Sequence, residues 1–283
     1  MMINFNIKNR FKKLGKGLIL AALILSLSVL SACGRQNDSV VVVAGSTSVQ
    51  PYAEVLAEKF MSLFPGSEID IQGGGSSAGI MAAETGTADI GMSSRDLNDQ
   101  ERELWSVEIA KDGLAVIVHP DNPVQELTLQ QIRDIYAAAV TDWGDLGGNA
   151  AKIHVITREE GSGTRSAFES MVMGDDRITP RAIVQDSNGA VRQLVSGDRN
   201  SIGFISLGLV NPAVKALRLD GVEATWENVL NNSYSLYRPF LFVAESQPAG
   251  LAGAYCDFVL SEEGQLYLAV EGLIPGTARN GKE

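Results

Sequence analysis

The chain has 283 residues, of which 45% are hydrophobic, 6% are aromatic and 29 are glycine, which is typical of an α/β protein long enough for two lobes. Its 34 Asp and Glu residues outnumber its 23 Lys and Arg residues, so the formal net charge is −11. This balance argues strongly against a nucleic-acid partner, because binding a phosphate backbone needs a basic face.

The first 33 residues have the pattern of a secretory leader. Basic residues precede the apolar run Leu18–Leu30, which is shorter than the roughly 20 residues that a membrane-spanning helix needs. The run ends in Leu30-Ser31-Ala32-Cys33, which resembles the bacterial lipobox, whose cysteine carries acyl groups such as palmitate and becomes the mature N-terminus. The alternative is an ordinary signal peptide with an incidental cysteine. We expect a lipoprotein signal peptide over 1–33, lipidation of Cys33 and a polar tether over 34–39.

Processing would make the chain still more acidic. The leader holds five basic residues and no acid, so its removal leaves 18 Lys and Arg against 34 Asp and Glu, a formal charge of −16. A small anion must then be captured by local donors against an unfavourable overall field. With Cys33 acylated, Cys256 has no partner for an intrachain disulfide. We expect Cys256 to be a buried apolar residue rather than a catalytic thiol.

Apolar periodicity predicts strands that alternate with helices along the mature chain. This alternation implies βαβ units and largely parallel sheets. The expected strands cover 40–44, 69–71, 88–92, 113–118, 152–157, 201–207 and 239–243. The expected helices cover 52–64, 78–84 and 97–105, one that opens at a capping box over 128–131, two around 168–172 and 191–195, and a helical region from 251 onward.

Four short stretches rich in Gly, Ser and Thr punctuate the chain, and three of them lie where a strand gives way to a helix. Such turns expose backbone N–H groups at the positive end of a helix dipole, which is an arrangement that binds anions. Arg158 adds a guanidinium fork that suits phosphate oxygens. Each stretch alone is typical of an ordinary turn, but together they predict an oxyanion surrounded by loops. The stretches are 45–48, 73–77, 93–95 and 161–164.

Other chemistry has weaker support in the residues. Residues 75–79 match the Gly-x-Ser-x-Gly pattern of a hydrolase with Ser77 as the nucleophile, but the two histidines of the chain, His119 and His154, carry no mark of a catalytic base. No glycine-rich loop carries the lysine of a nucleotide-binding P-loop. No His or Cys spacing indicates a metal site, so we expect neither metal nor cofactor.

The stretch Arg158-Glu159-Glu160-Gly161-Ser162-Gly163-Thr164-Arg165 resembles the Arg-x-x-Gly-Ser-Gly-Thr motif of the phosphate-binding proteins of bacterial phosphate ABC transporters. Residues 45–48, 72–79 and 89–94 are similar to the other loops of that family, in the same order. The resemblance covers roughly 40–275.

This resemblance implies an α/β protein with a two-lobe, periplasmic-binding-protein-like fold of type II and a ligand cleft between the lobes. Lobe 1 would comprise 40–118 plus 239–283, and lobe 2 would comprise 119–238. The chain would cross between the lobes at 118–123 and again at 237–243.

The resemblance also implies which residues bind phosphate and that none is catalytic. One departure stands out, because Ser94 replaces an aspartate that accepts the phosphate proton in other members. We therefore expect affinity that changes little with pH and weaker rejection of sulfate, unless Asp96 or Glu160 supplies a carboxylate. The implied ligands are Thr47, Ser48, Ser76, Ser94, Arg158, Ser162, Gly163 and Thr164.

The function that follows is a receptor held by a lipid anchor at the extracytoplasmic face of the cell membrane. It would capture inorganic phosphate and deliver it to the permease subunits of an ABC transporter. Three alternatives remain open: a binding protein for another oxyanion such as sulfate or molybdate, a serine hydrolase, and a purely structural surface protein.

Overall fold

The computed structural model describes residues 40–276. The expected leader over 1–33, its lipidation site Cys33 and the tether over 34–39 lie outside the described residues and stay predictions. Within the described range, no helix combines the length and the apolar character needed to cross a membrane.

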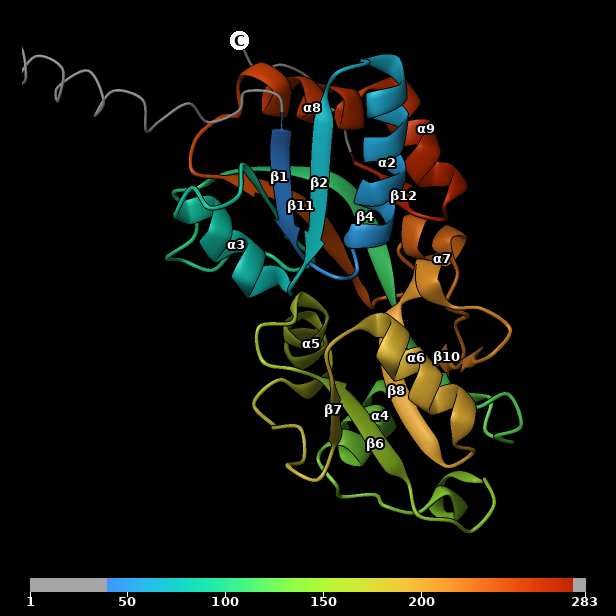
Figure 1. The fold of residues 1–283 in the computed structure, drawn as a ribbon. Helices are drawn as coiled ribbons and strands as arrows, with labels where there is room; N and C mark the ends of the chain where they lie inside the picture. The colour runs from blue at the N-terminus through green and yellow to red at the C-terminus, as the bar shows by residue number, and fades with distance from the viewer. Residues whose placement is uncertain (1–39, 277–283) are drawn as a thin grey trace, which may run out of the picture. The chain divides into compact units, whose positions relative to one another are not determined.

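One continuous run of hydrogen-bonded strands crosses the described part of the chain (Figure 1). Its members, in spatial order, are β2 (Glu68–Gly73), β1 (Val40–Gly45), β3 (Ile90–Ser93), β11 (Tyr237–Ala244), β4 (Trp105–Val118), β8 (Ser201–Ser206), β6 (His154–Arg158) and β7 (Ile183–Gln185). β1 pairs in parallel with β2 and β3, and β6 pairs in parallel with β7 and β8. β4 and β11 join the two halves and run antiparallel to each other. The predicted parallel pairing is therefore confirmed within each half, and the junction is antiparallel.

Four short strands complete the sheets. β9 (Lys215–Ala216) and β12 (Ile274–Pro275) pair with β4, and β5 (Glu126–Leu127) pairs with β10 (Arg218–Leu219).

Helices pack against both halves of the sheet (Figure 1). The predicted capping box is confirmed: the Thr128 hydroxyl accepts the Gln131 backbone N–H at 3.1 Å, and Oε1 of Gln131 accepts the Thr128 N–H at 2.8 Å. The α-helices are α2 (Gln50–Leu63), α3 (Ser76–Glu84), α4 (Leu129–Tyr136), α5 (Gly163–Phe168), α6 (Asn188–Gly197), α7 (Trp226–Leu230), α8 (Gly250–Leu260) and α9 (Glu262–Val270). The other helical turns are η1 (Trp143–Leu146), η2 (Glu169–Met173), which continues α5 as a π-helix, and η3 (Leu207–Leu209).

The predicted helix over 97–105 is wrong. Residues 97–104 form turns, and β4 begins directly after them. The Asn98 side chain accepts two backbone N–H groups at 2.9 and 3.2 Å, and the Glu101 carboxylate accepts both Nη atoms of Arg95 at 2.7 and 2.8 Å. Local bonds of this kind compete with the helical hydrogen-bond ladder, and here they hold the segment in turns.

Two large apolar cores lie on either side of the junction. Val107 and Ile109 of β4 pack in the first core together with Phe242 of β11. Leu114 and Val116, further along β4, pack in the second core. The chain therefore passes from one core to the other inside β4, before the crossing expected at its end.

We propose that the lobe boundary lies near Gly113 of β4, a few residues before the expected limit at residue 118. On the return strand β11, Tyr237 packs against the second core and Phe240 lies in the first, which supports a second boundary near residue 238. The first lobe then comprises residues 40–113 plus 239–276 of the described range, and the second lobe comprises 114–238.

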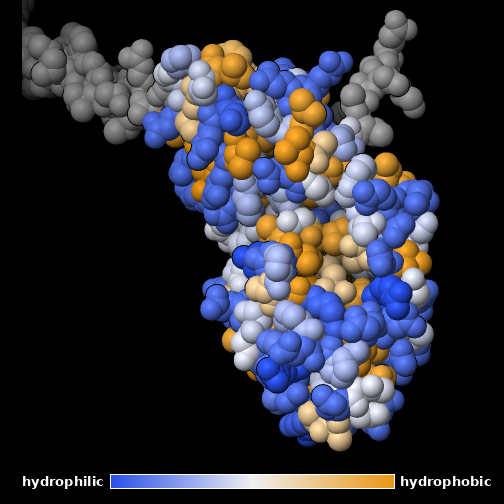
Figure 2. Space-filling view, turned by 90° about the vertical axis from the view of Figure 1, so that its right-hand side faces the viewer, coloured by the Kyte–Doolittle hydropathy of each residue, from blue (hydrophilic) through white to orange (hydrophobic). Residues whose placement is uncertain are grey.

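Figure 2 shows the hydropathy of one face of the molecule. Hydrophilic residues dominate this face, and apolar residues gather around a hollow near its middle. Some apolar side chains, such as Met81 and Val270, are exposed, which is ordinary on a protein surface.

Candidate anion-binding site

The carboxyl ends of the parallel strands bring the predicted loops together. Ser76 opens α3 after β2, Ser94 follows β3, and Arg158 ends β6. Ligands of open α/β sheets usually bind at this edge. Thr47 is half-buried there. The other predicted ligands are all buried: Ser48, Ser76, Ser94, Arg158, Ser162, Gly163 and Thr164.

Three serine hydroxyls form a chain on the first-lobe side. The Ser46 hydroxyl donates to Oγ of Ser94 at 2.9 Å, and Oγ of Ser76 lies 3.3 Å from Oγ of Ser94. The Ser94 backbone N–H donates to Oγ of Ser76 at 3.0 Å. Because Oγ of Ser94 accepts from Ser46, its own proton is available to Ser76 or to a ligand. Sequence reasoning did not select Ser46, although it lies in the predicted 45–48 loop.

Arg158 forms the charged part of the second-lobe side, and only 1% of it is exposed. Its guanidinium makes two bonds of 2.9 Å to the Glu159 carboxylate and donates to the backbone oxygens of Gln185 at 3.2 Å and Asp186 at 3.1 Å. Nη2 also reaches Oγ1 of Thr47 in the first lobe at 3.2 Å. The guanidinium is thus fixed in orientation, which suits a fork that recognises an oxyanion.

The two sides of the site touch each other directly. Oγ of Ser48 lies 2.8 Å from Oγ1 of Thr164. A Cβ added to Gly163 would come within 3.0 Å of Oγ of both Ser76 and Ser94. In this conformation the hydroxyls of the two sides therefore bond directly to each other.

Two buried donors that sequence reasoning missed converge on Ser48. Nδ2 of Asn188 donates to its Oγ at 2.8 Å, and Nη2 of Arg238 donates to it at 3.1 Å. A hydroxyl oxygen has two lone pairs, so the Ser48 proton must go to Thr164, whose own proton is left for a ligand. Two sequence features could have indicated these donors. One is the Ser-Asn-Gly stretch at the start of α6, and the other is Arg238, the one charged residue near the start of the apolar strand β11.

Two buried guanidinium donors stay unpaired. Among residues 40–276, Nη1 of Arg158 and Nη1 of Arg238 are buried and have no hydrogen-bond partner. Arg238 forms an ion pair with Asp112, with N–O distances of 3.1 and 3.2 Å. Burial raises the pKa of the Asp112 carboxyl, while the guanidinium of Arg238 and the hydroxyl of Ser206 oppose the rise. A buried donor without a hydrogen-bond partner destabilises a fold. A bound anion would accept hydrogen bonds from both Nη1 atoms.

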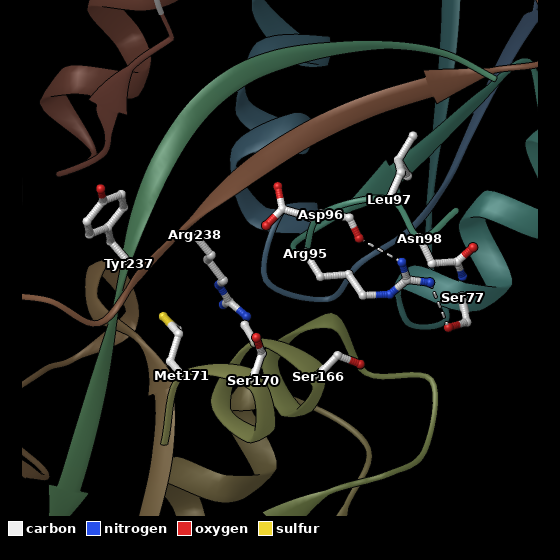
Figure 3. Close-up of a pocket in the computed structure, with 11 residues that line it drawn as sticks. Ser77, Arg95, Asp96, Leu97, Asn98, Ser166, Ser170, Met171, Tyr237 and Arg238 are labelled. Atoms are coloured by element: carbon white, nitrogen blue, oxygen red, sulfur yellow. Dashed lines mark hydrogen bonds between the residues drawn. The ribbon is translucent and has the colours of Figure 1, made fainter. Parts of the chain in front are cut away.

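A pocket of about 460 Å³ adjoins these residues (Figure 3). Figure 3 shows the Arg238 side chain extending from β11 toward the helical residues Ser166 and Ser170, with Arg95 on the other side. Arg95 is held by Glu101, and its Nη2 donates to Oγ of Ser77 at 3.3 Å. The pocket is therefore lined by both lobes.

No further carboxylate turns toward the serine that replaces the family's aspartate. Asp96 lines the pocket but is exposed, and Glu160 is exposed. The carboxylates of Glu159, Asp112 and Glu101 are each engaged by a guanidinium. The sequence-based possibility that Asp96 or Glu160 restores the acceptor finds no support in this geometry.

The arrangement around Ser77 does not resemble a hydrolase. His119 accepts the Asp121 backbone N–H at 3.0 Å, and His154 pairs with Asp198 at 2.6 Å, so neither ring contacts Ser77. His154 begins β6 and the anion site lies at the end of that strand, about 13 Å away at the usual rise per residue. Neither histidine therefore lies in the position of a base for this serine.

Cys256 lies in the first core with 4% of its surface exposed, and burial raises its pKa to about 12. The prediction of a buried apolar residue is confirmed. Among residues 40–276, no group of three or more His, Cys, Asp or Glu residues is placed to hold a metal ion.

Comparisons with known proteins identify the family of this chain. A family described as a PBP superfamily domain matches residues 31–263. The phosphate-binding protein PstS of Bacillus subtilis is 30% identical over 256 residues, which cover 87% of this chain and 84% of that protein. PstS of Pseudomonas aeruginosa is 34% identical over 269 residues, which cover 83% of this chain and 82% of that protein.

Two solved structures are also similar. A candidate phosphate ABC transporter substrate-binding protein from Clostridium perfringens, with bound phosphate, is 48% identical with a TM-score of 0.81 and covers 83% of this chain and 99% of its own. An ABC-type phosphate transport receptor from Vibrio cholerae is 38% identical with a TM-score of 0.71 and the same coverage.

Fold and site together define a two-lobe solute-binding protein of the α/β class, as the resemblance implied. Within the PBP superfamily, the chain belongs to the family of phosphate-binding proteins PstS.

Proposed function

We propose that this protein captures inorganic phosphate between its lobes and delivers it to the permease subunits of a phosphate ABC transporter. Its relatives are named as phosphate-binding proteins, and the Clostridium perfringens structure contains phosphate. The observation that carries the proposal is the buried guanidinium of Arg158, whose Nη1 is unpaired among converging serine and threonine hydroxyls. Phosphate supplies acceptors in all directions and would satisfy these donors together.

The roles of individual residues follow from their positions. Arg158 is the charged clamp. The first lobe contributes hydroxyl or backbone N–H donors from Thr47, Ser48, Ser76 and Ser94. The second lobe contributes Ser162, Gly163 and Thr164.

Capture proceeds by separation and closure of the lobes. The Ser48 to Thr164 contact has to open before the anion enters, and the anion then bridges the same groups. Because a bound anion takes the place of a direct contact, the loaded protein differs in lobe spacing from the conformation described above. That difference gives a permease a physical means of recognising the loaded state.

The protein acts by reversible binding, without covalent chemistry. Its named relatives are binding components of transport systems, and Ser77 lacks a contacting base. The processed chain is held at the extracytoplasmic face of the cell membrane by acyl groups on Cys33. Stable retention needs at least two chains, because a single acyl chain binds a membrane only marginally.

Calorimetric titration with phosphate, sulfate and molybdate tests the proposal on protein that has been stripped of bound anion. We expect one phosphate per chain and weaker binding of the other two anions. Binding of sulfate or molybdate without phosphate would identify another oxyanion as the ligand. Turnover of an ester that Ser77→Ala abolishes would favour a hydrolase, and the absence of any ligand-dependent thermal shift would favour a structural role.

A further inference from the structure

Arg238 occupies an unusual place for a charged residue. It lies on β11 directly opposite Asp112 of β4, on the two strands that join the lobes. Only 2% of Arg238 and 1% of Asp112 are exposed. Burying an ion pair this deeply costs desolvation free energy. Further hydrogen bonds to the guanidinium would offset part of that cost.

The guanidinium of Arg238 is hydrogen-bonded to Ser48, one of the predicted phosphate ligands. Nη2 donates to Oγ of Ser48 at 3.1 Å, and the same oxygen lies 2.8 Å from Oγ1 of Thr164. Burial lowers the pKa of Arg238, the Asp112 charge opposes this, and the positive charge of Arg158 adds to the lowering. The two guanidinium groups bond to adjacent residues, because Nη2 of Arg158 donates to Thr47 and Nη2 of Arg238 donates to Ser48. Each guanidinium retains one buried, unpaired Nη1.

The carboxylates beside these arginines are already engaged in ion pairs. Oδ1 of Asp112 accepts the Ser206 hydroxyl at 2.8 Å, and Oδ2 accepts two bonds from Arg238. Each oxygen of Glu159 accepts one bond from Arg158. The described site therefore offers two cationic forks and neutral hydroxyls, and a guanidinium competes with a ligand proton for both carboxylates.

We propose that Arg238 is a second charged ligand of the phosphate, and that Arg158 and Arg238 together make the site select the doubly charged anion. This inference rests on the proposed function and deepens it. Protonation of the dianion removes one negative charge that both guanidinium groups attract, so the monoanion binds more weakly. The nearly flat pH dependence expected from the serine at position 94 is therefore replaced by a preference for the dianion.

The other groups that face Arg238 do not supply this pH dependence. Tyr52 lies near Asp112 and Arg238, and burial raises its pKa, so its phenol stays neutral. Arg95 and the exposed Asp96 face Arg238 across the pocket. Asp112 is the one neighbour whose titration has to be separated from that of phosphate.

The first experiment removes the buried pair as a unit, because removing one charge alone would leave the other buried without a partner. In the double variant Arg238→Gln/Asp112→Asn, calorimetry should show phosphate affinity reduced about 30-fold or more. The control is Arg218→Gln/Glu126→Gln, which removes an ion pair of 3.0 Å outside the pocket and should bind within threefold of wild type. Circular dichroism and thermal unfolding establish that both double variants are folded.

The second experiment measures phosphate affinity from pH 5.5 to 8.5. Wild-type affinity should rise with pH and then level off, with a slope that approaches tenfold per pH unit where the monoanion predominates. Asp112→Asn should keep this slope, because the slope belongs to phosphate and not to the carboxyl. The double variant should lose most of it. Arg238→Lys, which keeps the charge but not the fork, should keep the slope at reduced affinity.

Wild type that binds phosphate with a flat profile would overturn the inference. So would a folded double variant that binds within threefold of wild type, because Arg238 would then be a structural partner of Asp112 only. Wild type that binds no phosphate at all would instead refute the proposed function, so the two failures are distinguishable.

Discussion

Gly163→Ala should separate ligand binding from stability. Gly163 is the first residue of α5, and its backbone is outside the left-handed region, so an alanine is conformationally acceptable there. The added methyl group would come within 3.0 Å of Oγ of both Ser76 and Ser94, whereas ordinary van der Waals contacts begin near 3.4 Å. The hydroxyls, or the lobes that carry them, would have to move.

The magnitude follows from this geometry. A displacement of about 1 Å takes a hydrogen bond of 2.8 Å beyond the range in which it counts as one. Losing two bonds to an anion, at about 1.5 to 3 kcal/mol each, costs about 3 kcal/mol or more, which is about 100-fold in affinity. The fold itself should be unaffected or slightly more stable, because alanine is favoured over glycine in a helix by about 0.5 to 1 kcal/mol.

Calorimetry and thermal unfolding test both halves of this prediction. At a phosphate concentration about 1,000 times the wild-type Kd, ligand binding stabilises wild type by about 4.1 kcal/mol, but a variant with 100-fold weaker affinity by only about 1.4 kcal/mol. The matched control is Gly189→Ala near the start of α6, where the nearest atom to an added Cβ lies 3.9 Å away. Phosphate binding by Gly163→Ala within threefold of wild type would refute the reasoning.

Four further predictions follow from the site and its surroundings. Arg158→Ala should weaken phosphate binding about 30-fold or more in calorimetry, whereas Arg165→Ala, whose guanidinium pairs with the glutamate one turn along, should bind within threefold. Ser94→Asp should strengthen discrimination against sulfate in competition titrations and should make phosphate affinity fall as pH rises, because the new carboxylate accepts a proton from the monoanion and repels the dianion. Hydrogen bonding to Arg95 lowers the pKa of Glu101, so its ionised form stabilises the fold above the unfolded pKa of about 4.3, and this contribution is lost as pH falls through the lower folded pKa. Glu101→Gln should therefore lower the urea midpoint at pH 7, and its difference from wild type should shrink as the pH falls below about 4.3. Cys33→Ala should block normal leader processing and abolish acylation of the chain, and normal leader removal with unchanged fractionation in this variant would contradict the lipid anchor.

Local features of the fold were predictable because their signals lie within a few residues. The capping box over 128–131 needs only two side chains that reach each other's backbone across one helical turn, and the structure contains it. The glycine and serine loops are also local, and parallel strands place their carboxyl ends at one edge. Because these loops share one edge of the sheet, the predicted phosphate ligands lie close together in the structure. The helix expected over 97–105 failed because side-chain bonds within that segment outcompeted a weak helical pattern.

The amino-acid sequence by itself determined the class of fold and the order of the glycine- and serine-rich loops along the chain, and it predicted from a family resemblance that Ser94 replaces an aspartate. Tertiary structure alone decided that Arg238 pairs with Asp112, 126 residues away, and that Asn188 reaches Ser48 across 140 residues. It also placed the change from the first apolar core to the second inside β4. The first contact depends on the register of β4 and β11, which places Arg238 opposite Asp112. The second depends on the packing that brings α6 next to Ser48. No local pattern encodes them, because the free energy of a buried ion pair is set by neighbours that only the folded chain brings together.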